Sequence, residues 1–92
     1  SIKTDLNDIN GALNDIDFVI DNYPDFIGSY FYRGITLAIS GDYSNAILDY
    51  DKSIELNQND FNTYYYRGKA KLALNDSNSA LEDFNTAIKY DP

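Results

Sequence analysis

The chain has 92 residues, 43% of them hydrophobic, and its 15 acidic and seven basic side chains give a formal net charge of −8. This length fits one small domain, and the negative charge disfavours nucleic acids and anionic membranes as partners, because both need a basic face. Cysteine and histidine are absent, which excludes disulfides, Cys/His zinc sites and histidine general bases.

The first 26 residues contain six aspartates and one lysine, which makes them the most acidic part of the chain. A helix is expected over 9–22, with Asp8 at its start. Residues 1–6 are expected to form the tail of a preceding helix.

The next segment predicts a pair of helices. Apolar residues spaced three and four apart predict a helix over 26–40 with one buried face. Gly41 is expected to end this helix, and Asp42 to cap the next one, over 43–57, by accepting from backbone N–H groups.

The last third of the chain repeats this pattern and predicts helices over 60–74 and 77–90. Asn75 stands where the preceding pair has Gly41, and asparagine also tolerates the left-handed conformation that such a helix end requires. We therefore expect five helices and no strand.

The helix pairs are copies of one another at a spacing of 34 residues. Tyr30-Phe31-Tyr32-Arg33-Gly34 falls on Tyr64-Tyr65-Tyr66-Arg67-Gly68, and a further shift towards the N-terminus finds a third, partial copy. Such a period is typical of stacked helical repeats. The columns with one residue type in all three copies are Asp8, Asp42 and Asp76; Ala12, Ala46 and Ala80; Asp15, Asp49 and Asp83; and Ile20, Ile54 and Ile88.

The period and the columns together resemble the tetratricopeptide repeat family over essentially the whole chain. The matching columns are the aromatic Tyr30 and Tyr64, the glycines Gly34 and Gly68, the alanines Ala12, Ala46 and Ala80, and the aromatic Tyr50 and Phe84. The resemblance implies an all-α fold in which antiparallel helix pairs stack into a right-handed superhelix, an α-α solenoid. We expect one domain over 1–92, about two and a half repeats long, with a partial repeat over 1–26 and full repeats over 27–60 and 61–92. No polar capping helix follows, so a fragment of a longer array is expected.

The resemblance also implies a concave groove lined by the first helix of each pair. Aromatic side chains there offer a large apolar area together with a hydroxyl group. The residues expected to line this groove are Phe31, Tyr32, Ile35, Ile39, Asn62, Tyr65, Tyr66 and Lys69.

We therefore expect a non-enzymatic scaffold that binds a neutral to basic peptide or protein segment in the cytoplasm. No catalytic residue, cofactor or metal ion is expected, because no nucleophile and base stand at a suitable spacing. Neither nucleic acid nor membrane is expected as a partner.

Two other functions remain open at this point. One is a structural module that assembles end to end through its uncapped terminal helices, and the other is an accessory domain of a larger protein. Uncovered apolar surface commonly marks an association site. The apolar residues expected to lie uncovered at the two ends are Ile2, Leu6, Phe18 and Ile20, and Phe84, Ala87, Ile88 and Tyr90.

Arg33 and Arg67 recur on the helix face that should pack against a second helix. A half-buried arginine needs a partner, and an aspartate can accept its two parallel N–H groups. Each arginine is expected to pair with an aspartate of its own or the preceding repeat, and the candidates are the column Asp15, Asp49 and Asp83. The alternative is that these charges are solvated and contribute little.

Overall fold

The computed structural model describes residues 6–26 and 28–91, with side chains from residue 8 onwards. These residues form the α-helices α1 (Leu6–Asn22), α2 (Gly28–Ile39), α3 (Tyr43–Leu56), α4 (Phe61–Ala73) and α5 (Ser77–Tyr90). The described part of the chain contains no β-strand, and none of its helices has the length and apolar character that crossing a membrane requires. The fold is the expected all-α helical repeat.

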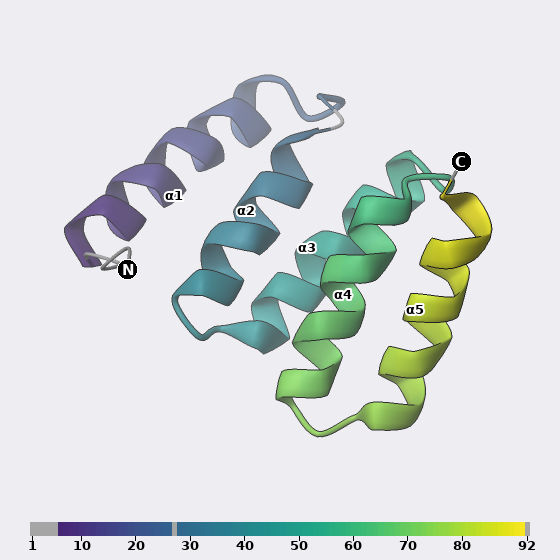
Figure 1. The fold of residues 1–92 in the computed structure, drawn as a ribbon. Helices are drawn as coiled ribbons and strands as arrows, with labels where there is room; N and C mark the ends of the chain where they lie inside the picture. Colours follow the sequence, from purple (N-terminus) through teal and green to yellow (C-terminus); the bar gives the residue numbers. More distant parts are fainter. Residues whose placement is uncertain (1–5, 27, 92) are drawn as a thin grey trace.

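Each helix packs against the next one along the chain, and α2 also contacts α4. Figure 1 shows the helices following one another from α1 at one side of the molecule to α5 at the other. The contact between α2 and α4 joins the first helices of the two full pairs, as stacked repeats require. Helix α1 contacts only α2 among the described helices.

The predicted helix ends agree with the structure within a few residues, except at the N-terminal side. Helix α1 already begins at Leu6, so Asp8 lies inside its first turn and does not cap it as predicted. A carboxylate in a first turn still interacts favourably with the positive end of the helix dipole. The predicted preceding helix falls mostly on residues 1–5, which lie outside the described residues.

The other predicted turns are confirmed. Gly41 has a φ of 91° and Asn75 a φ of 66°, so both adopt the left-handed conformation. The side chains of Asp42 and Asp76 accept hydrogen bonds, each 3.4 Å long, from the backbone N–H groups three residues later. Asp60 caps α4 in a similar way, which was not predicted.

Glycine and alanine columns let the helices of a pair approach closely, as predicted. A Cβ atom added to Gly34 would lie 2.6 Å from Cε1 of Tyr50, and one added to Gly68 would lie 2.8 Å from Cε1 of Phe84. The Tyr50 ring is buried together with Ala46 in the core. The missing glycine side chain is therefore the space that the aromatic ring of the second helix occupies.

Arg33 on α2 joins three helices. Its Nε and Nη2 atoms donate to Oδ2 and Oδ1 of Asp49 on α3, both at 2.8 Å, and its Nη1 atom donates to Asp17 on α1 at 2.9 Å. The Asp49 side chain is buried, so the two parallel bonds satisfy a carboxylate that has lost water. These hydrogen bonds, above all those to Asp49, raise the pKa of Arg33.

Arg67 on α4 repeats this arrangement one helix pair later. It forms two bonds of 2.9 and 2.7 Å to Asp83 on α5 and one of 2.8 Å to Asp51 on α3. Asp83 also pairs with Lys71 at 2.9 Å. Burial on its own would raise the pKa of Asp83, but the bonds to Arg67 and Lys71 outweigh it and hold that pKa below its usual range.

The predicted arginine–aspartate pairs are thus confirmed, with contacts both within and between repeats. One candidate is wrong, since the partner of Arg33 in the preceding repeat is Asp17 and not Asp15. Two residues along a helix turn a side chain to the opposite face, and Asp15 instead lines a pocket between α1 and α2.

We predict that Gly34→Ala lowers the free energy of unfolding by about 1–3 kcal/mol, because the new methyl group overlaps the buried Tyr50 ring. Gly11→Ala is the matched control, since Gly11 lies inside α1 with no atom near its Cβ position. That substitution is expected to add about 0.5–1 kcal/mol through helix propensity. Urea denaturation followed by circular dichroism measures both, and equal stability of the two variants would contradict this packing.

We predict that Arg33→Leu lowers the free energy of unfolding by about 3 kcal/mol, because it leaves the Asp49 carboxylate buried without a cation. Arg67→Leu is expected to cost less, since Lys71 still pairs with Asp83. The double variant R67L/K71L should restore the larger loss, because Leu37 stands in the place of Lys71 beside Arg33. Equal losses for the two single arginine variants in denaturant unfolding would show that Lys71 does not compensate.

Candidate functional site

The residues predicted for the concave groove all lie on α2 and α4, but they do not form one continuous surface. They are divided among a central pocket and a pocket at each end of the helix array. Phe31 lies between these pockets and lines none of them.

The central pocket, of about 270 Å³, lies between α2, α3 and α4. Four predicted groove residues, two from each of α2 and α4, are brought together here. The complete lining is Ile35, Ala38, Ile39, Tyr43, Tyr50, Tyr66, Lys69, Ala70 and Ala73. Three alanines in this lining leave the space that larger side chains would fill.

Phe31 belongs to the packing between helices. Its ring centroid lies 5.6 Å from that of Tyr32, 6.2 Å from Tyr50 and 5.5 Å from Tyr66. It is half-buried, and its edge-on contact with Tyr66 holds α2 against α4. The exposed rings of the predicted groove are those of Tyr32, 61% exposed, and Tyr65, 44% exposed.

Lys69 supplies the single positive charge of the central pocket. Its Nζ atom lies 5.4 Å from the ring centroid of Tyr65 and 5.3 Å from that of Tyr66. These cation–π contacts hold an exposed ammonium group beside the pocket, where it remains available to an acceptor.

Tyr43 and Tyr50 come from α3, which was not predicted to contribute to the site. Their spacing within the apolar stripe of that helix gave the signal, but it was interpreted as core packing alone. Burial raises the pKa of Tyr50 to about 12, with smaller contributions from Tyr66 and Asp49. The phenol of Tyr50 therefore stays protonated at neutral pH.

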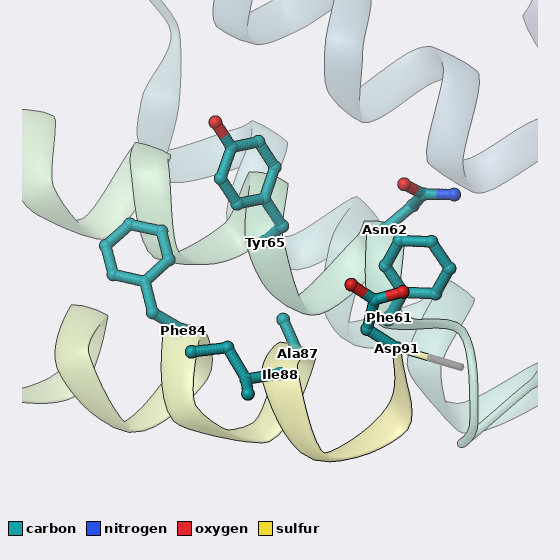
Figure 2. A pocket seen from close by; sticks show the side chains of 7 residues that line it. All are labelled: Phe61, Asn62, Tyr65, Phe84, Ala87, Ile88 and Asp91. Atoms are coloured by element: carbon teal, nitrogen blue, oxygen red, sulfur yellow. The ribbon is translucent and has the colours of Figure 1, made fainter.

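A second pocket, of about 580 Å³, lies at the α5 end of the array. Its lining consists of Phe61, Asn62, Tyr65, Phe84, Ala87, Ile88 and Asp91. Figure 2 shows Tyr65 and Phe61 on one side of this pocket and the α5 side chains on the other. Two predicted groove residues, Asn62 and Tyr65, thus belong to this end of the molecule.

A third pocket, of about 680 Å³, lies between α1 and α2 and contains the predicted groove residue Tyr32. The other lining residues are Asp15, Ile16, Val19, Tyr23, Phe26, Ser29 and Thr36. Apart from Asp15, the part contributed by α1 and the following turn is apolar or aromatic.

The predictions for uncovered end residues are partly corrected. Ile88 is 72% exposed and Phe18 64% exposed, but Ile20 and Ala87 are buried at 9% and 7%. Helix α2 covers Ile20, because it is the one described helix that contacts α1. Ile2 and the side chain of Leu6 lie outside the described residues.

The chemistry of the three pockets suits binding. Apolar and phenolic groups dominate their linings, with Lys69 the one cation among them. Within residues 6–26 and 28–91, no cluster of three or more acidic side chains is placed to hold a metal ion. Such surfaces recognise apolar side chains and fix them with a few polar groups.

Two solved crystal structures of MamA are similar to this fold. One aligns with a TM-score of 0.87 and 19% identity over 90% of this chain and 48% of the MamA chain. The other aligns with a TM-score of 0.85 and 20% identity over 89% of this chain and 45% of the MamA chain. This chain therefore spans about half the length of those proteins, and identity this low shows a common fold alone.

Comparison of the sequence with protein families gives two matches. A TPR repeat family model matches residues 34–75, and a tetratricopeptide repeat model matches residues 61–92. No match was found among curated proteins. The two family models together cover residues 34–92, and the chain belongs to the tetratricopeptide repeat family.

Proposed function

We propose that this chain is a non-enzymatic scaffold that binds a peptide or protein segment along the face formed by α2 and α4. The observation that carries the proposal is the central pocket, where Ile35, Ile39, Tyr66 and Lys69 converge from those two helices. A ligand lying across both helices would place one side chain in this pocket. Protein interaction is the general role of tetratricopeptide repeats.

The rings around the pocket support this proposal. Tyr32 and Tyr65 are exposed, and each stands in edge-on contact with a neighbouring ring that limits its motion. A side chain already ordered in the free receptor loses little entropy when the ligand binds. Aromatic residues held in this way are typical anchors of protein interfaces.

The charges of the chain indicate the chemistry of the ligand. A net charge of −8 repels acidic segments and favours a neutral to basic one. Lys69 at the pocket is suited to one carboxylate or carbonyl oxygen of the ligand. We propose an aliphatic or aromatic side chain in the pocket with such an acceptor next to it.

No catalytic role is part of the proposal. The lining of the central pocket contains no carboxylate, serine or threonine, and its phenol of Tyr50 is held protonated. Binding by shape and apolar contact accounts for every residue that the pocket brings together.

We predict that Ile39→Arg weakens ligand binding by about 2 kcal/mol or more, because it fills the central pocket with a charged side chain. The probes are peptides selected from a random display library on the wild-type chain, and titration calorimetry measures their affinity. Leu48→Arg is the control, since Leu48 is 63% exposed on α3 and lies outside the central pocket. Selected peptides that bind both variants with wild-type affinity would place the binding surface elsewhere.

End-to-end association of copies is a second candidate, supported by the apolar pockets at both ends of the array. Contact between two different ends is heterologous and builds open chains. A continuous superhelix would need α1 of one copy in the place of α5 of another, so the contact would form between the pockets themselves.

We predict for this second candidate that the average mass in sedimentation equilibrium rises with concentration. Ile88→Arg at one end and Tyr23→Arg at the other should reduce it equally, because a heterologous contact uses both ends. Both side chains are exposed, so neither substitution should disturb folding. A strictly monomeric chain at millimolar concentration would rule this candidate out.

A further inference from the structure

We infer that the α5-end pocket is a seat for one amphipathic helix supplied by another protein, docked as α4 docks on α2 and α3. This seat is separate from the central pocket and does not depend on the function proposed for that pocket. The argument uses the internal repeat, which gives every residue of the seat an equivalent whose covering helix is known.

The isoleucine column shows that something is missing at this end. Ile20 on α1 is 9% exposed, Ile54 on α3 is half-buried and Ile88 on α5 is 72% exposed. Helix α2 covers α1, and α4 packs on α3. Helix α5 contacts only α4, the other helix of its own pair, and no following helix covers it in the described residues.

The way α4 docks provides the template for the missing partner. The hydroxyl oxygen of Thr63 lies 3.5 Å from that of Ser53, and the Tyr66 ring lies 5.5 Å from the Phe31 ring. Ala70 belongs to the same buried cluster as Tyr50. The contacting residues of α4 are therefore spaced three and four apart on one face.

The floor of this template recurs in the seat. A shift of 34 residues carries Phe31 onto Tyr65, Tyr50 onto Phe84 and Ser53 onto Ala87. All three of these equivalents line the seat, and Figure 2 shows their side chains on the two helices that enclose it. The seat is thus continuous in design with an interface that the molecule already forms.

Differences between the floor and its template define the incoming helix. Ala87 has no hydroxyl group where Ser53 has one, so the residue in the place of Thr63 should be small and apolar. An aromatic residue three positions later would contact Tyr65 and Phe84, and a small residue four positions after that would correspond to Ala70. Asp91 lies on the lining where that helix would begin, and a carboxylate stabilises a helix N-terminus.

A second copy of this chain offers this face poorly. Its α2 carries Ser29, Tyr32 and Thr36 at the matching spacing, but these residues already line the pocket against α1. Its α4 is packed against α2 and α3. A helix of a different protein is therefore the occupant that needs no part of the fold to open.

A peptide with the sequence of residues 60–74 and Thr63→Ala, which carries the required stripe, is the probe for the seat. Nuclear magnetic resonance of the 92-residue chain should show shifts confined to the seat, around Tyr65, Phe84 and Ile88. Ile88→Arg should weaken peptide binding at least about tenfold. Leu81→Arg, on the same helix and 59% exposed, should change it less than about twofold.

The same peptide with Tyr66→Ala should also bind at least about tenfold more weakly, since it lacks the aromatic anchor. Absence of binding by the first peptide, unchanged binding to the Ile88→Arg variant, or shifts centred on the central or α1–α2 pocket would each overturn the proposal. Self-association of the chain without peptide, abolished by Ile88→Arg, would make a second copy the occupant and would overturn it too. Circular dichroism of each variant shows that the helices remain.

Discussion

Two arginines fix how the helices of this protein stack. Each one forms two parallel bonds to a buried aspartate of the next helix and a third bond to an aspartate of the preceding helix. A guanidinium group is planar and rigid, so it tolerates little variation in the positions of its partners. Three helices are therefore held in one relation at Arg33, and the same relation returns at Arg67. The face formed by α2 and α4 depends on this repetition.

Close packing and binding surface come from the same columns. Gly34 admits the Tyr50 ring to the interface between two helices, and that ring then forms part of the central pocket. Small residues such as Ala38 and Ala70 permit close approach of the helices and leave the pocket open. The end pockets are packing surfaces of the same kind without a covering helix. In a stacked-repeat protein each unit contacts only its neighbours, so an uncovered packing surface is available to a partner.

Local features of the fold could be predicted because they depend on neighbouring residues. The caps Asp42 and Asp76 and the left-handed turns at Gly41 and Asn75 follow from the side chain at one position and its backbone conformation. Asp8 shows the limit of this reasoning. It shares a column with the two caps, yet it lies inside α1, because its helix extends further towards the N-terminus.

The sequence by itself determined the helix pairs, their repeat and the partnership of arginine with aspartate, since a period of 34 residues and a helical stripe are properties of one segment at a time. Only the tertiary structure decided that Asp17 rather than Asp15 meets Arg33 and that Tyr43 and Tyr50 belong to the central pocket. It also divided the predicted groove among three pockets and placed Phe31 in the packing between helices. The physical reason is that pockets and ion pairs between helices depend on the rotation and separation of separate segments. Those quantities are set by side chains that meet from different repeats.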